Sequence, residues 1–319
     1  MFLPIAWPRI STVHRVCIPP VVVFPYIFLY ASVVSKSFIT PQNHEQEMAR
    51  YPYDSIIFHP GRQCRTCKFP KPARSKHCSY CKACVSRQDH HCVWMTNCVG
   101  SNNYHYFLSL LLSLSALLIY GSCLGYSLLS QTLNQIFPPG SGVDLSKQNW
   151  IMFFNVWSVV ISYDIRIGTV TLLAFMTTPL AMAFLVYHTY LIWAGMTTNE
   201  SAKWAEWRDE VFEGCVFKST RGEIYGNSPV PGEDSKRRLS WPVSSDQILV
   251  VTDGQPPAEG YMLSSRSNDV VQPDDPDAPV DSRWVRVRSM REVDNIYDLG
   301  FWDNCRDAFN LPIYKMHYT

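Results

Sequence analysis

Three long stretches without charged residues dominate the pattern of hydrophobic and polar positions along the chain. They cover residues 17–34, 104–129 and 167–194. Each is close to or above the ~20 apolar residues that a helix needs to cross a bilayer. The pattern therefore predicts three transmembrane helices. For the second and third stretches the alternative is a buried core helix, which their lack of Lys, Arg, Asp and Glu disfavours.

The first stretch and one shorter apolar run raise separate questions. The first stretch contains three prolines, so a signal peptide is the alternative to a span, but no small-x-small cleavage site followed by a polar segment supports that alternative. The run at residues 150–161 is too short to cross a bilayer and precedes Asp164 and Arg166. We expect this run to lie at the membrane interface.

The distribution of basic residues predicts the orientation of the spans. Residues 36–103 contain ten Lys and Arg, whereas residues 131–166 contain two. Because loops rich in Lys and Arg stay in the cytosol, the first loop is expected to be cytosolic and the second lumenal. The region from Thr197 onward is then cytosolic as well, and the N-terminus lies on the far side with Arg9 and Arg15.

Seven of the 11 cysteines fall between residues 64 and 98, and their spacing repeats. In a reducing cytosol such clusters indicate metal sites before disulfides. Two sets of three cysteines and one histidine are offset by fourteen residues: Cys64, Cys67, His77 and Cys84, then Cys78, Cys81, His91 and Cys98. Three thiolates and one imidazole form a closed tetrahedral shell for zinc, so we expect two structural zinc ions. A sequential grouping of the first four cysteines around one ion remains the alternative.

The interleaved grouping leaves Cys92 and His90 unassigned. A leftover thiol is usually a buried, inert cysteine. Cys92 differs because it follows the ligand His91 and the free His90 on a loop shaped by two ions. His90 can take the proton of the thiol, and Asp89 can hold the imidazole in the useful tautomer. Cys92, His90 and Asp89 are therefore the predicted catalytic set. The alternative for Asp89 is an ordinary surface or capping carboxylate.

The same residues resemble a known family, the DHHC protein acyltransferases. The resemblance rests on the motifs Cys64-x2-Cys67, Cys78-x2-Cys81-x2-Cys84, Asp89-His-His-Cys92, Cys98 and Asn103-x3-Phe107, and on the later Thr197-Thr-Asn-Glu200. It implies a palmitoyltransferase in which Cys92 carries the acyl group from palmitoyl-coenzyme A, or another long-chain acyl-coenzyme A, to a substrate cysteine.

Two further features refine the resemblance. Most members have four spans, whereas one span is predicted here before the Cys-rich loop, as expected if an earlier span lies outside this sequence. The motifs Tyr51-Pro-Tyr-Asp and Tyr104-His-Tyr-Phe-Leu-Ser are similar to those of a fungal branch of the family that acts on SNARE-type proteins. The resemblance therefore implies membrane-anchored substrates with juxtamembrane cysteines and a location in the endoplasmic reticulum.

The expected fold class is an α-helical polytopic membrane protein with a small cytosolic zinc-binding Cys-rich domain between spans and a largely disordered C-terminal tail. The predicted segments are an N-terminal span (1–35), the cytosolic Cys-rich domain (36–103), a span (104–130), a lumenal loop (131–166), a span (167–195), a cytosolic helix-competent segment (196–226), a disordered linker (227–290) and a C-terminal docking segment (291–319). Pro, Ser, Gly and Asp accumulate in the linker, and such a composition cannot bury enough apolar surface to fold alone. Aromatic residues return in the last segment, which is expected to dock on the cytosolic side of the membrane domain.

Several local motifs complete the picture. Thr197-x-x-Glu200 fits a helix capping box. Arg237-Arg-Leu-Ser240 resembles a basophilic kinase site, although four-residue matches are mostly chance. An acyl chain is expected among the spans, lined from 104–129 and 175–190. Five basic residues are either phosphate contacts for coenzyme A or solvated loop charges: Arg65, Lys68, Lys71, Arg74 and Lys76.

Composition and ligand chemistry limit the rival functions. The net charge of +1 provides no field that would attract nucleic acid, so the lipid bilayer is the expected large partner. A zinc-stabilised membrane scaffold without chemistry is the main alternative, and the unassigned Cys92 beside His90 argues against it. A metal-dependent hydrolase is disfavoured because a closed shell of three Cys and one His leaves zinc no open position.

Overall fold

The computed structural model describes residues 4, 6–138, 149–226, 239–244, 246–263, 270, 271, 273 and 278–313. The chain divides into two compact units. The first, here called the helical unit, comprises Met1–Ser32 and Tyr106–His188. The second, here called the Cys-rich unit, comprises Val33–His105 and Thr189–Thr319.

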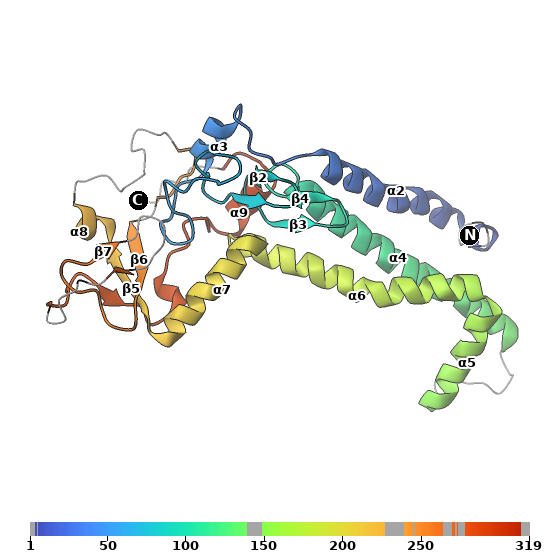
Figure 1. Cartoon of the computed structure of the whole chain (residues 1–319). Helices are drawn as coiled ribbons and strands as arrows, with labels where there is room; N and C mark the ends of the chain where they lie inside the picture. The colour runs from blue at the N-terminus through green and yellow to red at the C-terminus, as the bar shows by residue number, and fades with distance from the viewer. Residues whose placement is uncertain are drawn as a thin grey trace. The chain divides into compact units, whose positions relative to one another are not determined.

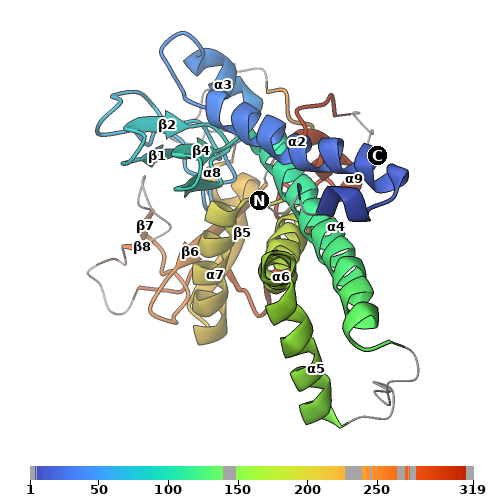
Figure 2. The same cartoon turned by 90° about the vertical axis from the view of Figure 1, so that its right-hand side faces the viewer.

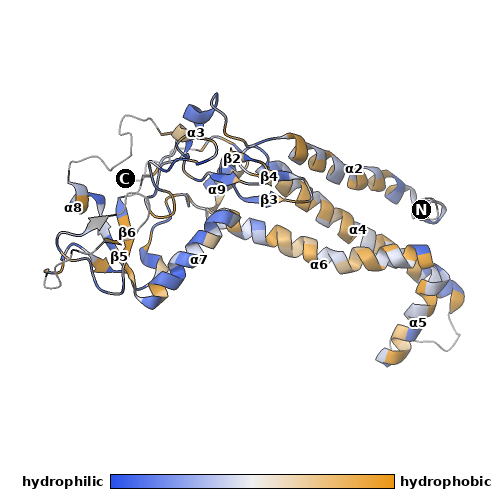
Figure 3. Ribbon diagram, in the orientation of Figure 1, coloured by the Kyte–Doolittle hydropathy of each residue, from blue (hydrophilic) through white to orange (hydrophobic). Residues whose placement is uncertain are grey.

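Three helices are long and apolar enough to cross a membrane. They are α2 (Thr12–Val34), α4 (Tyr104–Ile136) and α6 (Ile165–Trp193), and hydrophobic residues predominate along all three (Figure 3). The prediction of three apolar helices is confirmed. The shorter apolar run forms the fourteen-residue α5 (Trp150–Tyr163), below the length of a span.

A cluster of buried aliphatic residues joins the long helices inside the helical unit. Ile18 of α2, Leu128 of α4 and Ile167 of α6 belong to it. Arg9, in the short helix η1 (Trp7–Arg9), donates to the carboxylate of Asp164 at 2.5 Å and to the carbonyl of Leu128 at 2.7 Å. Arg9 is therefore paired with a carboxylate and is not a lone charge.

Two short antiparallel hairpins form the centre of the Cys-rich unit and lie next to each other (Figures 1 and 2). Strand β1 (Lys76–Cys78) pairs with β2 (Ala83–Val85), and β3 (His90–Cys92) pairs with β4 (Asn97–Val99). The short helix α3 (His44–Arg50) precedes them. Each hairpin places a histidine directly opposite a cysteine, as His77 faces Cys84 in the first.

Helix α7 (Thr198–Glu213) follows the last long helix. Thr197 caps its first turn: its hydroxyl accepts from the Glu200 amide, and the Glu200 carboxylate accepts from the Thr197 amide. The predicted capping box is confirmed, and Gly214 ends the helix in the left-handed conformation that suits a residue without Cβ. The remaining elements are β5 (Val216–Thr220), α8 (Arg221–Tyr225), β6 (Gln247–Val251), β7 (Met262–Leu263), β8 (Val270–Val271), β9 (Val285–Arg286), η2 (Met290–Glu292) and α9 (Phe301–Ala308).

The linker expected at 227–290 contains more structure, where it is described, than its composition indicated. Strands β6 and β9 flank β5 in a three-stranded sheet, and Leu249 and Trp284 are buried. Strand β5, which pairs with both, lies outside the Pro-rich region. The Pro-rich region alone therefore contains too little apolar surface for its composition to predict the sheet. Residues 227–238 and several later positions of the linker lie outside the described residues.

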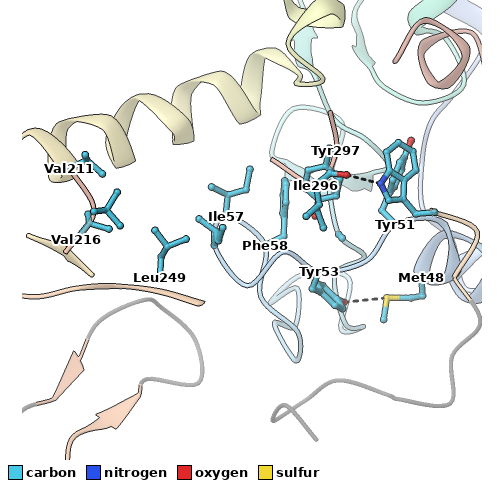
Figure 4. Packing of buried hydrophobic residues seen from close by; sticks show 14 residues of the cluster. Met48, Tyr51, Tyr53, Ile57, Phe58, Val211, Val216, Leu249, Ile296 and Tyr297 are labelled. Atoms are coloured by element: carbon cyan, nitrogen blue, oxygen red, sulfur yellow. Dashed lines mark hydrogen bonds between the residues drawn. The ribbon is translucent and has the colours of Figure 1, made fainter. Parts of the chain in front are cut away.

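Aromatic residues from distant parts of the sequence form the main core of the Cys-rich unit (Figure 4). Tyr51 and Phe58 come from before the hairpins, Trp241 from the linker and Tyr297 from the C-terminal segment. The Tyr297 hydroxyl donates to the carbonyl of Pro52 at 2.8 Å. Of the aromatic residues described in the C-terminal segment, Tyr297 thus packs into the core of the Cys-rich unit, whereas Trp302 and Phe309 are exposed.

Candidate metal centres and nucleophile

The structure brings the first predicted ligand set together. Hairpin β1–β2 supplies His77 and Cys84, and the preceding turn supplies Cys64 and Cys67. The Nδ1 atom of His77 lies 3.5 Å from both Cys64 Sγ and Cys67 Sγ and 3.9 Å from Cys84 Sγ. Cys64 and Cys84 are buried, and the other two residues are half-buried.

The second predicted set has the same construction one repeat later. His91 and Cys98 face each other across hairpin β3–β4, while Cys78 and Cys81 come from hairpin β1–β2. The Nδ1 atom of His91 lies 3.6, 3.4 and 3.6 Å from the sulfurs of Cys78, Cys81 and Cys98. The ligands therefore group in the interleaved order and not in the sequential one.

The spacing of the donor atoms fits zinc. With Zn–S bonds of about 2.3 Å and Zn–N bonds of about 2.0–2.1 Å, a tetrahedral shell has S···N edges of about 3.6 Å and S···S edges of about 3.8 Å. The measured S···N separations are 3.4–3.9 Å, and Cys81 Sγ lies 3.6 Å from Cys98 Sγ. Both sets are thus already arranged as closed four-ligand sites.

Cys92 belongs to neither set and contacts His90. The two residues begin and end strand β3, and their side chains form a hydrogen bond. The Nδ1 atom of His90 lies 2.7 Å from the Asp89 carboxylate, which leaves Nε2 for the thiol. The three residues of the predicted catalytic set therefore lie together, in the order carboxylate, imidazole and thiol.

The turn after Cys92 repeats the turn of each metal-binding Cys-x2-Cys pair. Lys68, Lys82 and Thr96, each four residues after a cysteine, have positive φ angles of 61°, 53° and 48°. The amide of Cys67 donates to Cys64 Sγ, the amide of Cys81 donates to Cys78 Sγ, and the amide of Met95 donates to Cys92 Sγ. Cys92 thus has the backbone environment of a zinc-bound thiolate, with Met95 in place of a second cysteine.

These contacts shift the ionisation of both partners. Burial lowers the pKa of His90, but hydrogen bonds to Asp89 and Cys92 outweigh burial and raise that pKa to about 9. Burial raises the pKa of Cys92, but the hydrogen bond from His90 and the backbone amides outweigh it, so this pKa lies below the ordinary thiol value. Both shifts favour the thiolate of Cys92 and the imidazolium of His90 over the neutral pair.

Helix α7 holds Asp89 in place. The Thr198 amide donates to one carboxylate oxygen of Asp89 at 2.9 Å, and the Thr198 hydroxyl donates to the other at 2.8 Å. Thr197 donates to the carbonyl of Gln88 at 3.2 Å. Sequence reasoning found the capping box but missed Thr198, whose only signal was its position next to Thr197.

A buried charge network also escaped the sequence analysis. Asp307 of α9 lies 3.4 Å from Arg74 and 2.9 Å from Arg87, and it accepts a hydrogen bond of 2.6 Å from Tyr51. Arg74 also forms a bidentate pair with Glu200: its Nε donates to Oε1 at 2.7 Å and its Nη2 donates to Oε2 at 2.6 Å. Arg74 is therefore committed to structure and is removed from the residues considered for phosphate contacts.

Two adjoining cavities lie beside His90 in the Cys-rich unit. One borders Asp89, His90 and Thr198, and it shares Lys76 and Asn199 with the other. The second has a volume of about 350 Å³, and its lining includes one acidic residue, Glu206, and four basic ones: Arg62, Lys71, Lys76 and Lys203. Burial lowers the pKa of Lys203 to about 8, so this lysine stays largely protonated at neutral pH. The cavity suits an anionic group.

A third cavity lies within the helical unit. Its volume is about 270 Å³, and all of its lining residues come from the three long helices. The lining consists almost wholly of apolar atoms and includes Val22, Leu118 and Leu173, together with the ring of Tyr120. The cavity suits a hydrocarbon chain.

The family model described as DHHC palmitoyltransferase matches residues 57–205. Palmitoyltransferase swf1 of Aspergillus fumigatus is 66% identical over 98% of this chain and 83% of its own length. Palmitoyltransferase swf1 of Emericella nidulans is 63% identical over 99% of this chain and 77% of its own, and palmitoyltransferase SWF1 of Neurospora crassa is 40% identical over 98% and 72%.

Proposed function

Because the chain belongs to the DHHC palmitoyltransferase family, we propose that it is a protein S-palmitoyltransferase in which Cys92 carries the acyl group. The observation that carries the assignment to Cys92 is its position. It is the one cysteine of the seven between residues 64 and 98 that belongs to neither metal-binding set, and it is hydrogen-bonded to His90. A purely structural domain has no use for this pair.

Two zinc ions, one in each set of three Cys and one His, are proposed as structural ions. Bound zinc supplies cross-links that fix the hairpins, since a closed shell offers no site for substrate. Cys78 and Cys81 from the first hairpin share their site with His91 and Cys98 from the second. The second site thus ties the two hairpins together and fixes the start of the strand that holds Cys92.

The proposed reaction has two steps. In the first, the Cys92 thiolate attacks the thioester carbonyl of acyl-coenzyme A, the bond from that carbon to the coenzyme A sulfur breaks, and the departing thiolate takes the proton held by His90. In the second, His90 takes the proton of a substrate thiol, whose sulfur attacks the acyl-Cys92 carbonyl and releases the enzyme thiolate. Asp89 stabilises the imidazolium in both steps.

The two ends of acyl-coenzyme A have separate proposed sites. The basic cavity lined by Arg62, Lys71, Lys76 and Lys203 is proposed for its phosphates because it adjoins the cavity beside His90. The apolar cavity of the helical unit is proposed for the acyl chain, since each CH2 removed from water contributes about 0.8 kcal/mol.

The proposed location is the endoplasmic reticulum, with the Cys-rich unit in the cytosol. The excess of Lys and Arg in residues 36–103 supports this orientation. The proposed substrates are membrane-anchored proteins with cysteines beside their anchors, of the SNARE type, because three helices of this chain are long and apolar enough to cross the same membrane.

Incubation of the purified chain with radiolabelled palmitoyl-coenzyme A tests the proposed function. The expected result is label that hydroxylamine removes, as a thioester requires, and that passes to an added substrate protein. A chain that keeps both zinc ions but never takes up label is the zinc-stabilised scaffold of the alternative hypothesis.

A further inference from the structure

Ser240 is attached to the end of helix α3 by three hydrogen bonds. Its amide donates to the carbonyl of Ala49 at 2.9 Å. Its hydroxyl donates to the carbonyls of Ala49 and Arg50 at 3.2 and 3.0 Å. The side chain is nevertheless exposed to solvent. This residue therefore serves as an anchor that can be reached from outside.

The anchor holds an indole in the core of the Cys-rich unit. Trp241 is only 7% exposed, and its Nε1 donates to the carbonyl of Ile296 at 2.8 Å. Its ring centre lies 5.0 Å from that of Tyr51 and 6.4 Å from that of Tyr297. Release of this one residue would leave a large hole among the aromatic side chains.

The sequence before Ser240 is Arg237-Arg-Leu, which places arginines three and two positions before the hydroxyl. These two arginines lie outside the described residues. We propose that Ser240 is a phosphorylation site for a basophilic serine kinase, and that its phosphorylation releases Trp241 from the core. In the transfer step a bond forms between Ser240 Oγ and the γ-phosphorus of ATP. The bond from that phosphorus to the β–γ bridging oxygen breaks, ADP leaves, and the hydroxyl proton passes to the base of the kinase.

Hydrogen-bond chemistry explains why the phosphate opposes docking. The Ser240 hydroxyl is a donor to two carbonyl oxygens, whereas a phosphate dianion offers only acceptors. It also adds about −2 charges at the C-terminal, electronegative end of α3. The cation nearest in sequence to these carbonyls, Arg50, already donates to Asn310 at 2.5 Å and lies over the Tyr51 ring at 5.4 Å. Repulsion therefore replaces the hydrogen bond that the single hydroxyl proton shares between the two carbonyls.

Docking and phosphorylation also compete with each other. A kinase binds its target segment in extended form, which requires Ser240 and Trp241 to leave α3 and the core. The undocked form is thus the kinase substrate, and by reciprocal linkage the phosphate traps the chain in that form. This coupling gives the proposal two independent readouts, neither of which depends on acyl transfer.

The first readout is the site and rate of phosphorylation. The full-length purified chain is incubated with ATP and the catalytic subunit of a basophilic kinase, and occupancy at residue 240 is measured by mass spectrometry. We expect modification of Ser240, and a rate lower by about tenfold or more when Arg237 and Arg238 are both replaced by Ala. Trp241→Ala should raise the rate about tenfold, after each rate is divided by that of a synthetic peptide with the same sequence, which corrects for the effect of the substitution on kinase recognition. An unmodified Ser240 in the wild-type chain and in Trp241→Ala would overturn the proposal.

Ser289 provides a matched control. It also follows arginines, at positions 286 and 288, but its hydroxyl accepts a hydrogen bond of 3.3 Å from Arg291 and it anchors no buried indole. Ser289→Ala should leave modification at residue 240 unchanged. A Trp241→Ala chain that is modified faster at Ser289 to the same degree would show general unfolding instead of local release, and would overturn the coupling.

The second readout is hydrogen exchange of the peptide 239–244, compared with a peptide from α7 as the reference. Phosphorylation, and Ser240→Asp as its mimic, should raise exchange of 239–244 by about tenfold while the α7 peptide stays protected. Ser240→Asn, which keeps a donor and adds no charge, should leave exchange within about threefold of the wild type. Equal or stronger protection after phosphorylation, as expected if Arg50 turned to bind the phosphate, would overturn the release.

Discussion

The turns that follow Cys78 and Cys92 have the same backbone and different proposed fates. Both cysteines end the first strand of a hairpin, both are followed four residues later by a positive φ angle, and both accept a hydrogen bond from the amide three residues on. Cys78 belongs to a four-ligand set, whereas Cys92 belongs to none. The comparison suggests that a turn built to stabilise a metal-bound thiolate also stabilises a free one.

The positions before each cysteine explain why only one of them is reactive in this account. In the first hairpin, Ser75 and Lys76 precede His77 and Cys78. At the equivalent positions of the second hairpin, fourteen residues later, Asp89 and His90 precede His91 and Cys92. A base and its orienting carboxylate are therefore present in the second hairpin alone. A third metal set would also require cysteines at the positions held by Met95 and Leu112. Without them the thiolate stays available.

The largest expected effect separates the two cysteines. Cys92→Ser should lower acyl transfer by at least about 10³-fold, because a serine hydroxyl has no comparable anionic fraction at neutral pH. It should keep both zinc ions. Cys78→Ser should instead lose zinc and stability, because the free energy of metal binding is folding free energy at such a site. Elemental analysis of the purified variants decides; zinc loss in Cys92→Ser would make Cys92 a ligand and contradict the comparison.

A smaller effect is expected when the base is removed. His90→Ala should slow acyl-enzyme formation by about 10²-fold, since both the base and the cation that lowers the Cys92 pKa are lost. Raising the pH should restore part of the rate, because the thiol of the variant ionises only as pH rises towards its now higher pKa. Single-turnover rates between pH 7 and 9 provide the measurement.

Two companion variants sharpen that test. His91→Ala should lose one zinc ion and gain nothing from higher pH, because its imidazole is assigned to the metal. Lys76→Ala, at the position equivalent to His90, should raise the KM for acyl-coenzyme A with a flat pH response, since Lys76 lines the basic cavity. If His90→Ala and His91→Ala exchanged these behaviours, the fourteen-residue register of the account would be wrong.

A third prediction concerns the carboxylate that links the two hairpins. Arg74 and Arg87 precede the first and second hairpin, have φ angles of 59° and 42°, and both face Asp307. Asp307→Asn should lower the free energy of unfolding by about 2–3 kcal/mol, because the buried guanidinium of Arg87 loses its carboxylate partner and Arg74 keeps only Glu200. Asp303→Asn is the matched control, since Asp303 pairs only locally with Arg306 at 2.8 Å, and it should cost less than about 1 kcal/mol.

The pH dependence of this loss has a definite sign. Burial raises the pKa of Asp307, but the charges of Arg87 and Arg74 outweigh burial and hold that pKa below its ordinary value of 3.8. The stabilisation is therefore complete above that value and disappears as pH falls through the lower pKa of the folded state. Chemical denaturation at pH 7 and below pH 4 should show the difference between wild type and Asp307→Asn shrinking in acid. A constant difference would mean that folding leaves the pKa of Asp307 unchanged.

The smallest expected effect comes from restoring the missing ligand. Met95→Cys recreates a Cys-x2-Cys pair on a turn that already has the matching backbone. Added zinc should then inhibit acyl-enzyme formation by up to about tenfold in the variant, and a mild chelator should reverse the inhibition. The wild-type chain under the same zinc concentration is the control. Equal inhibition of both proteins would show that the two turns are not equivalent.

Patterns that repeat locally predicted part of the molecule well. The three uncharged runs predicted the apolar helices, the fourteen-residue spacing predicted the two donor sets that the structure brings together, and Thr197 with Glu200 predicted the helix cap. Each of these signals lies within one continuous stretch of sequence, the longest at residues 64–98. The physical cause, hydrophobicity or ligand spacing, is therefore present in a short window of sequence.

Contacts between distant segments could not be predicted in the same way. Asp307 meets Arg74 and Arg87 across more than two hundred residues, and nothing near any of the three marks the partnership. Strands β5 and β6 are separated by a Pro-rich stretch whose composition hides the sheet. Thr198 acquires its role only because the start of α7 packs on Asp89. Tertiary packing determines all three.

The most direct test of the central claim is to map the acyl group after a single turnover. The chain is loaded with palmitoyl-coenzyme A, digested without thiols, and every cysteine peptide is weighed, with the zinc content measured on the same sample. The account predicts one palmitoyl group, removable by hydroxylamine, on Cys92, with two zinc ions still bound. A palmitoyl group on Cys78 or any other ligand cysteine, or zinc release in step with acylation, would contradict it.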